Sequence, residues 1–293
     1  MNTGLQLIEK DICSRICDSL DKVGLLYRIF SRTKEIKSIQ EKLDRKTQEG
    51  MPYSKDGKKM QDVIGIRVIT YFQDDIPLVK GILSKVFIYL SEEIDSHAHT
   101  VFKPKRTNVI CKLDTNNEML FNEVKETDSY NILSVVDSTF ELQLRTILSE
   151  GWHEIDHSLR YKCKDEWEKH GEKERMLNGI YATLEVNDIA LKSLFNELAY
   201  QHFKIKDWEA MLRNKYRLKF QLSSLKPELK QILDEDNDLA KELFKIEREN
   251  VLSQLAESDI TVPINFNNII YLINHFVIKN DKIRDLTPEY IRN

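Results

Sequence analysis

Two carboxylates in this sequence stand where metal-assisted phosphoryl transfer could take place. Asp62 directly precedes a run of β-branched and aromatic residues at 63–72, and Glu141 lies in an alternating segment at 140–145. This chemistry needs one carboxylate that holds Mg²⁺ against a triphosphate and a second that accepts the proton of an attacking hydroxyl group. We therefore expect Asp62 and Glu141 to form a reaction centre and to be the ligands of a magnesium ion.

Basic side chains crowd the segment that precedes Asp62. They are Arg28, Arg32, Lys34, Lys37, Lys42, Arg45 and Lys46. Lys and Arg bind phosphate oxygens through charged hydrogen bonds, and Lys42 and Lys46 are one helical turn apart. Because Glu35, Glu41 and Asp44 interleave with them, a solvated helix of mixed charge is the alternative interpretation.

Strands are the elements that must position the two carboxylates. Residues 63–72 and 109–113 have the composition of strands. The period of two at 140–145 predicts another strand, with Glu141, Gln143 and Arg145 on one side.

The spacing of apolar residues predicts helices in most of the rest of the chain. The expected helices are one with Ile8, Ile12, Ile16 and Leu20 on one face, ended by Gly24, and others at 28–48, 76–93, 174–203, 206–219 and 227–256. The segment 50–59 is expected to be a loop. Together the elements predict an α+β fold, a mixed β-sheet flanked by helices with a helical C-terminal extension.

Three ordered motifs resemble the synthetase domain of the RelA/SpoT family. They are the segments 31–42, 62–67 and 141–146, and their order and separations agree as well. The segment 154–162 is similar to the helix that follows in the small alarmone synthetases, and 208–213 resembles the helical tail of some members. The resemblance covers residues 20–165 and implies a nucleotidyltransferase-like synthetase domain at 1–170, with N-terminal helices, and a helical extension at 171–293.

The resemblance implies a magnesium-dependent transferase that moves pyrophosphate from ATP to the 3′-hydroxyl of a nucleotide. Arg32 and Lys34 would bind the ATP phosphates, with Lys42, Arg45, Lys46 and Arg67 as further contacts. Asp62 would bind Mg²⁺, Glu141 would take the proton of the hydroxyl group, and Gln143, Arg145 and His157 would orient or neutralise groups around the site. For Arg67, an ion pair that fixes its strand to a neighbouring helix is the alternative.

One departure from the family pattern leaves the acceptor open. Members that use guanosine acceptors usually carry a Gly-Tyr-x-Ser-x-His word whose Tyr stacks on the base, and this sequence has Phe102 to Asn108 in that region instead. Phe102 or Tyr130 could supply a ring, and Lys105 and Arg106 could bind the acceptor's phosphates. GDP or GTP, giving a (p)ppGpp-type alarmone and AMP, is the first candidate; another purine nucleotide is the second and a tRNA 3′ end the third, as in a toxin or defence effector.

A zinc peptidase is the rival enzyme. Residues 153–157 spell H-E-x-x-H, with Glu166 and His170 as candidates for a third ligand. The inner pair of such a helix normally packs in the core, whereas here it contains Asp156. Accidental matches to so short a pattern are common.

A non-catalytic module that binds RNA or regulates another protein is the third reading. The stretch 204–219 holds six basic and two acidic residues, which could grip a phosphate backbone. The alternative is an amphipathic helix with Trp208, Met211 and Leu212 in the core.

Composition limits the partners. The 44 basic and 48 acidic residues give a net charge of −4, no apolar stretch approaches a membrane span, and four cysteines are too few for a disulfide framework. We expect a cytoplasmic protein without a membrane partner. Because the resemblance begins near residue 20, we expect a synthetase without its own hydrolase domain, so a hydrolase or an antitoxin is the expected protein partner; a homo-oligomer is also compatible with the sequence.

Overall fold

The structure is a computed structural model that describes residues 3–94, 107–128 and 131–292. The chain divides into two compact units, each built from separate segments. The first comprises Met1–Cys17, Tyr27–Tyr71 and Leu83–Glu185, and the second comprises Asp18–Leu26, Phe72–Ile82 and Val186–Asn293. Helices α1 (Thr3–Lys22) and α7 (Gly171–Lys204) contribute residues to both units.

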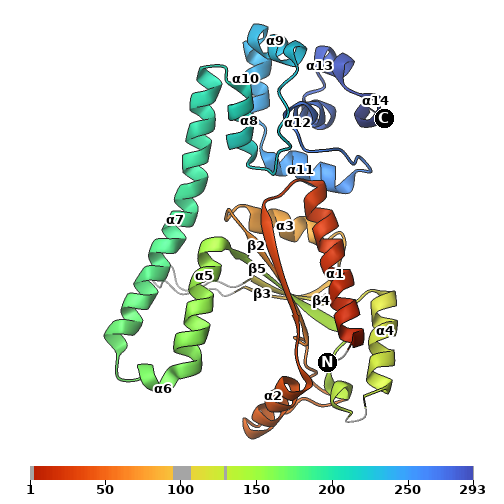
Figure 1. Cartoon of the computed structure of the whole chain (residues 1–293), viewed down its shortest axis with the longest axis vertical. Helices are drawn as coiled ribbons and strands as arrows, with labels where there is room; N and C mark the ends of the chain where they lie inside the picture. Colours follow the sequence, from red (N-terminus) through yellow and green to blue (C-terminus); the bar gives the residue numbers. More distant parts are fainter. Residues whose placement is uncertain (1–2, 95–106, 129–130, 293) are drawn as a thin grey trace. The chain divides into compact units, whose positions relative to one another are not determined.

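A mixed β-sheet forms the centre of the first unit (Figure 1). Among the described residues its strands are β1 (Tyr27–Thr33), β2 (Ile64–Thr70), β3 (Tyr89–Ile94), β4 (Thr107–Lys112) and β5 (Thr139–Thr146), in the order β1-β2-β5-β4-β3. Strands β2 and β5 are parallel, and the other neighbours are antiparallel. The β-branched residues of β2 suit this central position, since both neighbours of the strand are hydrogen-bonded to it.

The two faces of the sheet differ in polarity. Phe140 contacts Phe87, over which Arg15 of α1 lies, so this face carries the apolar core beneath the helix. Helix α5 (Ile147–Ile155) lies against β2 and β5.

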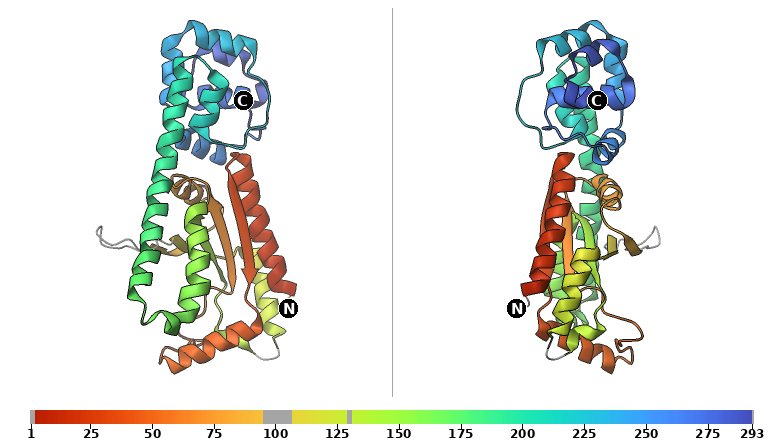
Figure 2. Two further views of the ribbon diagram at one scale, coloured as in Figure 1. Left: turned by 60° about the vertical axis from the view of Figure 1, so that its left-hand side comes forward. Right: turned by 90° about the vertical axis from the view of Figure 1, so that its right-hand side faces the viewer.

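Further helical segments of the unit are α2 (Ile36–Gln48), α4 (Thr115–Glu126), η1 (Ile132–Val135), the π-helical turn η2 (Asp156–Arg160), η3 (Tyr161–Cys163) and α6 (Lys164–Trp167) (Figure 2).

Short helices form most of the second unit. They are α3 (Asp75–Leu83), α8 (Trp208–Tyr216), α9 (Pro227–Glu235), α10 (Asn237–Lys245), α11 (Arg248–Glu257), α12 (Phe266–Ile273), the π-helical η4 (Asn274–Ile278), α13 (Asp281–Leu286) and α14 (Glu289–Arg292). Side chains of α8 and α12 are fully buried, among them Met211, Tyr216 and Ile270. This unit therefore has an apolar core of its own.

The α+β fold with a mixed sheet and a helical C-terminal region is confirmed. The first helix and the strands at 63–72, 109–113 and 140–145 are present, each within a few residues of the expected bounds. The division at residue 170 stays a prediction. No helix in residues 3–94, 107–128 or 131–292 is long and apolar enough to cross a membrane.

Three helix predictions were wrong in part. Residues 27–33 form strand β1 rather than the start of a helix, because they pair with β2 from Tyr27↔Thr70 to Thr33↔Ile64. The helix expected at 76–93 ends at Leu83, and strand β3 follows. The segment 227–256 contains three helices instead of one, with breaks at Asp236 and Ile246.

Candidate active site

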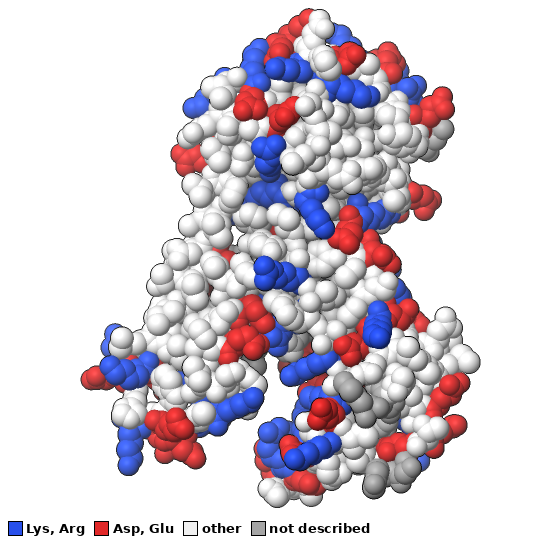
Figure 3. All heavy atoms as spheres, viewed as in Figure 1, with Lys and Arg blue, Asp and Glu red and all other residues white. Residues whose placement is uncertain are grey.

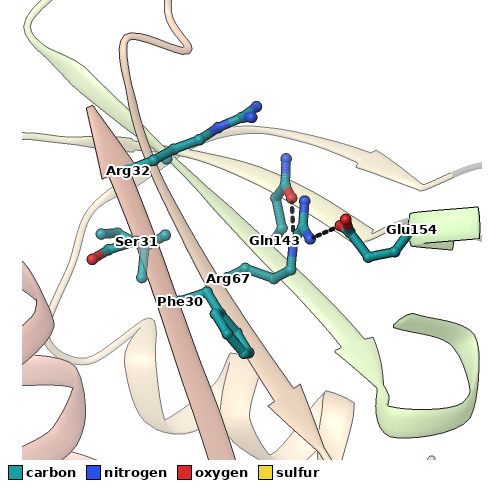
Figure 4. A pocket seen from close by; sticks show the side chains of 8 residues that line it. Phe30, Ser31, Arg32, Arg67, Gln143 and Glu154 are labelled. Carbon is teal, nitrogen blue, oxygen red and sulfur yellow. Dashed lines mark hydrogen bonds and ion pairs between the residues drawn. The ribbon is translucent and has the colours of Figure 1, made fainter. Parts of the chain in front are cut away.

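The register of three strands brings a row of polar side chains together on one face of the sheet. Arg32 of β1 is opposite Gly65 of β2, and Gly65 is opposite Glu141 of β5. Arg67 and Gln143 form the next pair along the same face. A Cβ atom on Gly65 would lie 3.8 Å from Cγ and 3.9 Å from Nε of Arg32, so the arginine lies across the glycine (Figure 4).

Asp62 is bound by two ammonium groups just before β2 begins. Lys34 Nζ donates to Asp62 Oδ2, and Lys42 Nζ donates to the same oxygen at 2.6 Å. Lys34 follows β1 directly and its backbone N–H donates to Val63 O at 2.8 Å, while Lys42 lies on α2. Burial opposes ionisation of Asp62, but the two lysines outweigh it and hold the pKa of the carboxyl below its ordinary value.

Glu141 has neutral partners instead. Asn108 Nδ2 donates to Oε1 at 3.1 Å and Gln143 Nε2 donates to Oε2 at 2.9 Å. Two amides from β4 and β5 thus fix the orientation of this carboxylate, and no cation among the described residues pairs with it, which is an arrangement suited to a proton acceptor.

Arg67 and Arg145 are joined through α5. Arg67 Nε donates to Gln143 Oε1 at 2.9 Å, and its Nη1 binds Glu150 and, at 2.7 Å, Glu154. Arg145 Nη1 donates to the second carboxylate oxygen of Glu150 at 2.8 Å. The ion pair between the strand and a neighbouring helix, which was the alternative for Arg67, is present.

Two cavities open at this face. The smaller has a volume of about 130 Å³ and is lined by Phe30, Ser31, Arg32, Gly65, Ile66, Arg67, Gln143 and Glu154 (Figure 4). The larger has a volume of about 620 Å³, and Arg32, Arg67, Gln143, Arg145, His157 and Lys162 are among its lining residues. Both therefore offer cationic donors to an anionic ligand.

The structure brings most predicted site residues together. Arg32, Arg67, Gln143, Arg145 and His157 line the larger cavity, and Lys34 and Lys42 converge on Asp62. His157 is stacked on Tyr161 with ring centroids 5.8 Å apart, and burial lowers its pKa.

Two other predicted residues, Arg45 and Lys46, have a different partner. Arg45 and Lys46 lie on α2 and pair with Glu49, Lys46 at 2.6 Å. Phe102, Lys105, Arg106 and Tyr130 lie outside the described residues.

Sequence reasoning missed Phe30, Asn108 and Glu150. Phe30 was assigned to a helix, although a strand places it beside Arg67 at the smaller cavity. Glu150 and Glu154 are four residues apart on the helix that follows β5, and this spacing was the available signal for a pair of acidic groups facing the arginines.

The geometry does not favour a zinc site. His153 packs against Trp152 and Tyr181, with ring centroids 5.6 and 6.4 Å away, whereas Glu154 pairs with Arg67. Within the described parts of the chain, no three His, Cys, Asp or Glu side chains are grouped so as to hold a metal ion. Catalytic zinc needs three protein ligands of these types.

The basic stretch at 204–219 is partly buried, since Lys215 and Arg217 are buried while its other four basic residues are exposed. Trp208, Met211 and Leu212 are buried, as the amphipathic alternative predicted. Lys215 pairs with Glu247 at 3.3 Å and Arg217 with Asp74 at 2.6 Å. Basic and acidic side chains intermingle on the face of the molecule shown in Figure 3.

Comparisons with known proteins concern the same region. Residues 31–166 match a family model described as a region found in RelA / SpoT proteins. The GTP pyrophosphokinase YjbM of Bacillus subtilis (strain 168) is 29% identical over 138 residues, which cover 46% of this chain and 56% of that protein. The match thus spans little more than half of this curated relative.

This chain is also similar to solved structures, at lower sequence identity. The small alarmone synthetase 1 from Bacillus subtilis is 19% identical, with a TM-score of 0.48 over 67% of this chain and 94% of that chain. The crystal structure of that synthetase bound to its product pppGpp is 20% identical, with a TM-score of 0.45 over 67% of this chain and 94% of that chain.

Proposed function

From the match of residues 31–166 to a region found in RelA / SpoT proteins, we propose that the chain is a magnesium-dependent pyrophosphokinase. It transfers pyrophosphate from ATP to the 3′-hydroxyl group of a nucleotide acceptor. Two carboxylate sites carry the proposal. Asp62, just before β2, is bound by two lysines, and Glu141, on β5, is oriented by two amides. Glu141 is opposite Gly65 of β2, across which Arg32 lies.

The residues present fit a magnesium ion. Asp62 Oδ1 is buried and accepts no hydrogen bond from the described residues, which leaves a hard oxygen ligand available. Mg²⁺ is usually held by one or two carboxylates together with substrate phosphates and water, so a third protein ligand is not required. Asp62 would hold the ion with Glu141 as the second candidate. When bound, Mg²⁺ would neutralise phosphate charge.

In this reaction some side chains of the site bind phosphate and another accepts a proton. Lys34 and Lys42 bind phosphate oxygens of ATP, and Arg32 and Arg67 offer further charged donors from the cavity walls. Glu141 accepts the proton of the acceptor's 3′-hydroxyl group, whose oxygen then bonds to the β-phosphorus of ATP. The bond from that phosphorus to the oxygen bridging it to the α-phosphorus breaks, and AMP leaves with this oxygen.

GDP or GTP is the proposed acceptor, ahead of another purine nucleotide and of a tRNA 3′ end. The net charge of −4 gives no general attraction to RNA, and Lys215 and Arg217 are held in ion pairs. A cytoplasmic location and a hydrolase or antitoxin partner accompany this proposal.

Incubation with ATP labelled at the γ-phosphate tests the function. Purified chain, Mg²⁺ and a panel of GDP, GTP, adenine nucleotides and tRNA are combined, and products are separated. We expect equal amounts of AMP and of one labelled acceptor, and product formation slower by about 10²–10⁴ with Glu141→Gln. Absence of AMP and of labelled acceptor with every member of the panel would refute the proposal, whereas label on tRNA alone would reverse the ranking of acceptors.

A further inference from the structure

We propose that Glu150 is a positioning residue that holds Arg67 and Arg145 in place for nucleotide binding; this inference rests on the proposed function. Its carboxylate uses one oxygen for each arginine: Oε1 binds Nη1 of Arg67 and Oε2 accepts from Nη1 of Arg145 at 2.8 Å. One side chain thus connects a residue of β2 with a residue of β5.

The turn from β5 into α5 puts Glu150 at this point. Thr146 ends the strand and caps the helix, since its Oγ1 accepts from the backbone N–H of Ser149 at 3.1 Å. No loop intervenes, so the first turn of α5 stays beside the strand ends. Glu150 lies in that turn, where a negative charge is also favoured by the helix dipole.

Electrostatics explain why a carboxylate is needed there. Arg67 is opposite Gln143, two residues before Arg145, so the two guanidinium groups are diagonal neighbours on one face. Burial lowers the pKa of Arg145, and the charge of Arg67 lowers it further. Only 9% of the Arg145 side chain and 12% of the Glu150 side chain are exposed, so water screens little of this repulsion. The anion between the two cations offsets it and sets their separation.

The contact between Glu150 and Arg67 is linked through Gln143 to Glu141, the proposed proton acceptor. Arg67 Nε donates to Gln143 Oε1, and Gln143 Nε2 donates to Glu141 Oε2, each at 2.9 Å. Because the guanidinium engages the amide oxygen, the amide nitrogen is turned toward Glu141. Both arginines also line the larger cavity. Glu150 therefore influences ligand binding and the orientation of Glu141 without contacting either directly.

Three substitutions separate positioning from bulk stability. Glu150→Gln removes the charge and keeps the shape, whereas Glu150→Asp keeps the charge on a shorter side chain. Glu174→Gln is the matched control, because Glu174 pairs with Arg160 at 2.7 Å and neither residue lines the two cavities described above. Binding of an ATP analogue with a methylene group between the α- and β-phosphates is measured by calorimetry with Mg²⁺, beside kcat, KM and Tm.

We expect Glu150→Gln to weaken binding of the analogue about tenfold or more and to lower kcat as well, since small displacements of positioned groups have effects of that size. Glu150→Asp should regain part of the binding, and Glu174→Gln should match the unsubstituted chain. A lower Tm with unchanged dissociation constant and kcat, measured well below that Tm, would show a structural role only and overturn the proposal. If Glu150→Gln does not fold, unchanged binding and kcat in folded Glu150→Asp overturn it instead.

The measurement of analogue binding also distinguishes a failure of this inference from a failure of the proposed function. If the unsubstituted chain does not bind the analogue, the proposed function fails first, and the positioning role fails with it. If the unsubstituted chain binds the analogue and folded Glu150→Gln binds it equally with unchanged kcat, only the role of Glu150 is refuted.

Discussion

Three carboxylates on or beside one sheet face differ in the groups that surround them. Asp62 is bound by two ammonium groups, Glu150 by two guanidinium groups and Glu141 by two neutral amides. Cations stabilise an ionised carboxylate and so suit a metal ligand or a positioning anion. Only Glu141 lacks a cationic partner among the hydrogen bonds described, and the environments therefore divide the roles among residues of similar chemistry.

Glu141→Gln tests the proton acceptor. Glutamine keeps the length of the side chain but cannot accept a proton. Its oxygen can accept from Gln143, and its amide nitrogen can donate to Asn108 once the Asn108 amide rotates to present its oxygen. We expect kcat to fall by about 10²–10⁴ with little change in Tm. The measurement is the initial rate of AMP formation beside thermal unfolding; near-normal turnover in the folded variant would show that another group takes the proton.

Asp62→Asn tests the metal ligand and its lysine partners together. Asparagine is a weaker ligand for Mg²⁺, so the Mg²⁺ concentration for half-maximal rate should rise. Lys34 and Lys42 lose their anion while only 16% and 20% of their side chains are exposed, so we expect a stability loss of about 1–3 kcal/mol. Rates over a Mg²⁺ titration and urea unfolding measure the two effects. An unaltered Mg²⁺ dependence would remove Asp62 from the proposed metal site.

At the scale of elements, the end of α1 depends on a glycine in the left-handed region. Gly24 has φ of +69°, its N–H donates to Asp21 O, and the next residue, Leu25, donates to Leu20 O. A Cβ atom there would lie 2.8 Å from Cγ1 of Ile264, in the same compact unit. Two separate constraints, backbone conformation and space, thus apply at this position.

Gly24→Ala and Gly50→Ala separate these constraints. Gly50 has a similar φ of +71° but nothing within 4 Å of the added atom. We expect Gly50→Ala to cost about 1 kcal/mol from the backbone alone, and Gly24→Ala to cost at least about 1 kcal/mol more from the contact with Ile264. Urea unfolding of both variants measures this. Equal losses would mean that the side chain of Ile264 moves away freely.

Elements with a strong local pattern could be predicted from the sequence, and those defined by a distant partner could not. Strands β2 and β5 are rich in apolar or alternating residues, which gave Asp62 and Glu141 their correct places before and within a strand. Strand β1 has four exposed positions out of seven and owes its conformation to pairing with β2. Leu90 fits by coincidence the four-residue spacing of the helix expected at 76–93. It lies instead on strand β3, where it is 51% exposed. Of the candidate site, Glu150 was missed because its role depends on how α5 packs.

At the scale of the whole molecule, chain order and compact units do not coincide. Residues 72–82 follow the central strand β2 but belong to the second unit with the C-terminal helices. Within that unit Asp74 pairs with Arg217 at 2.6 Å and Asp75 pairs with Arg248 at 2.8 Å. Contacts across such sequence separations have no local signature, so a reading of periodicity could not assign this segment to the helical unit.

The pH dependence of stability should depend on these two aspartates, of which Asp75 is buried and Asp74 is half-buried. Burial raises the pKa of Asp75 to about 6, although Arg248 opposes the shift. The folded chain therefore binds this proton more tightly than the unfolded chain, whose carboxyl has an ordinary pKa near 3.8. As pH rises from about 4 to above 6, the folded state must release the proton, and its stability falls by an amount on the order of 3 kcal/mol.

Asp75→Asn removes this dependence and Asp74→Asn does not. For Asp74 burial also raises the pKa, but Arg217 outweighs it and the pKa lies below the ordinary value. The stability that Asp74 contributes is then present above pH 4 and is lost only as pH falls below that point. Urea unfolding at intervals between pH 4 and 7 should show the unsubstituted chain losing stability relative to Asp75→Asn. Asp74→Asn should still lose stability over this range, but less steeply, because the charge of Asp74 contributes to the raised pKa of Asp75. If the unsubstituted chain instead gains on Asp75→Asn as pH rises, the ion pair with Arg248 outweighs burial and Asp75 is ionised throughout this range.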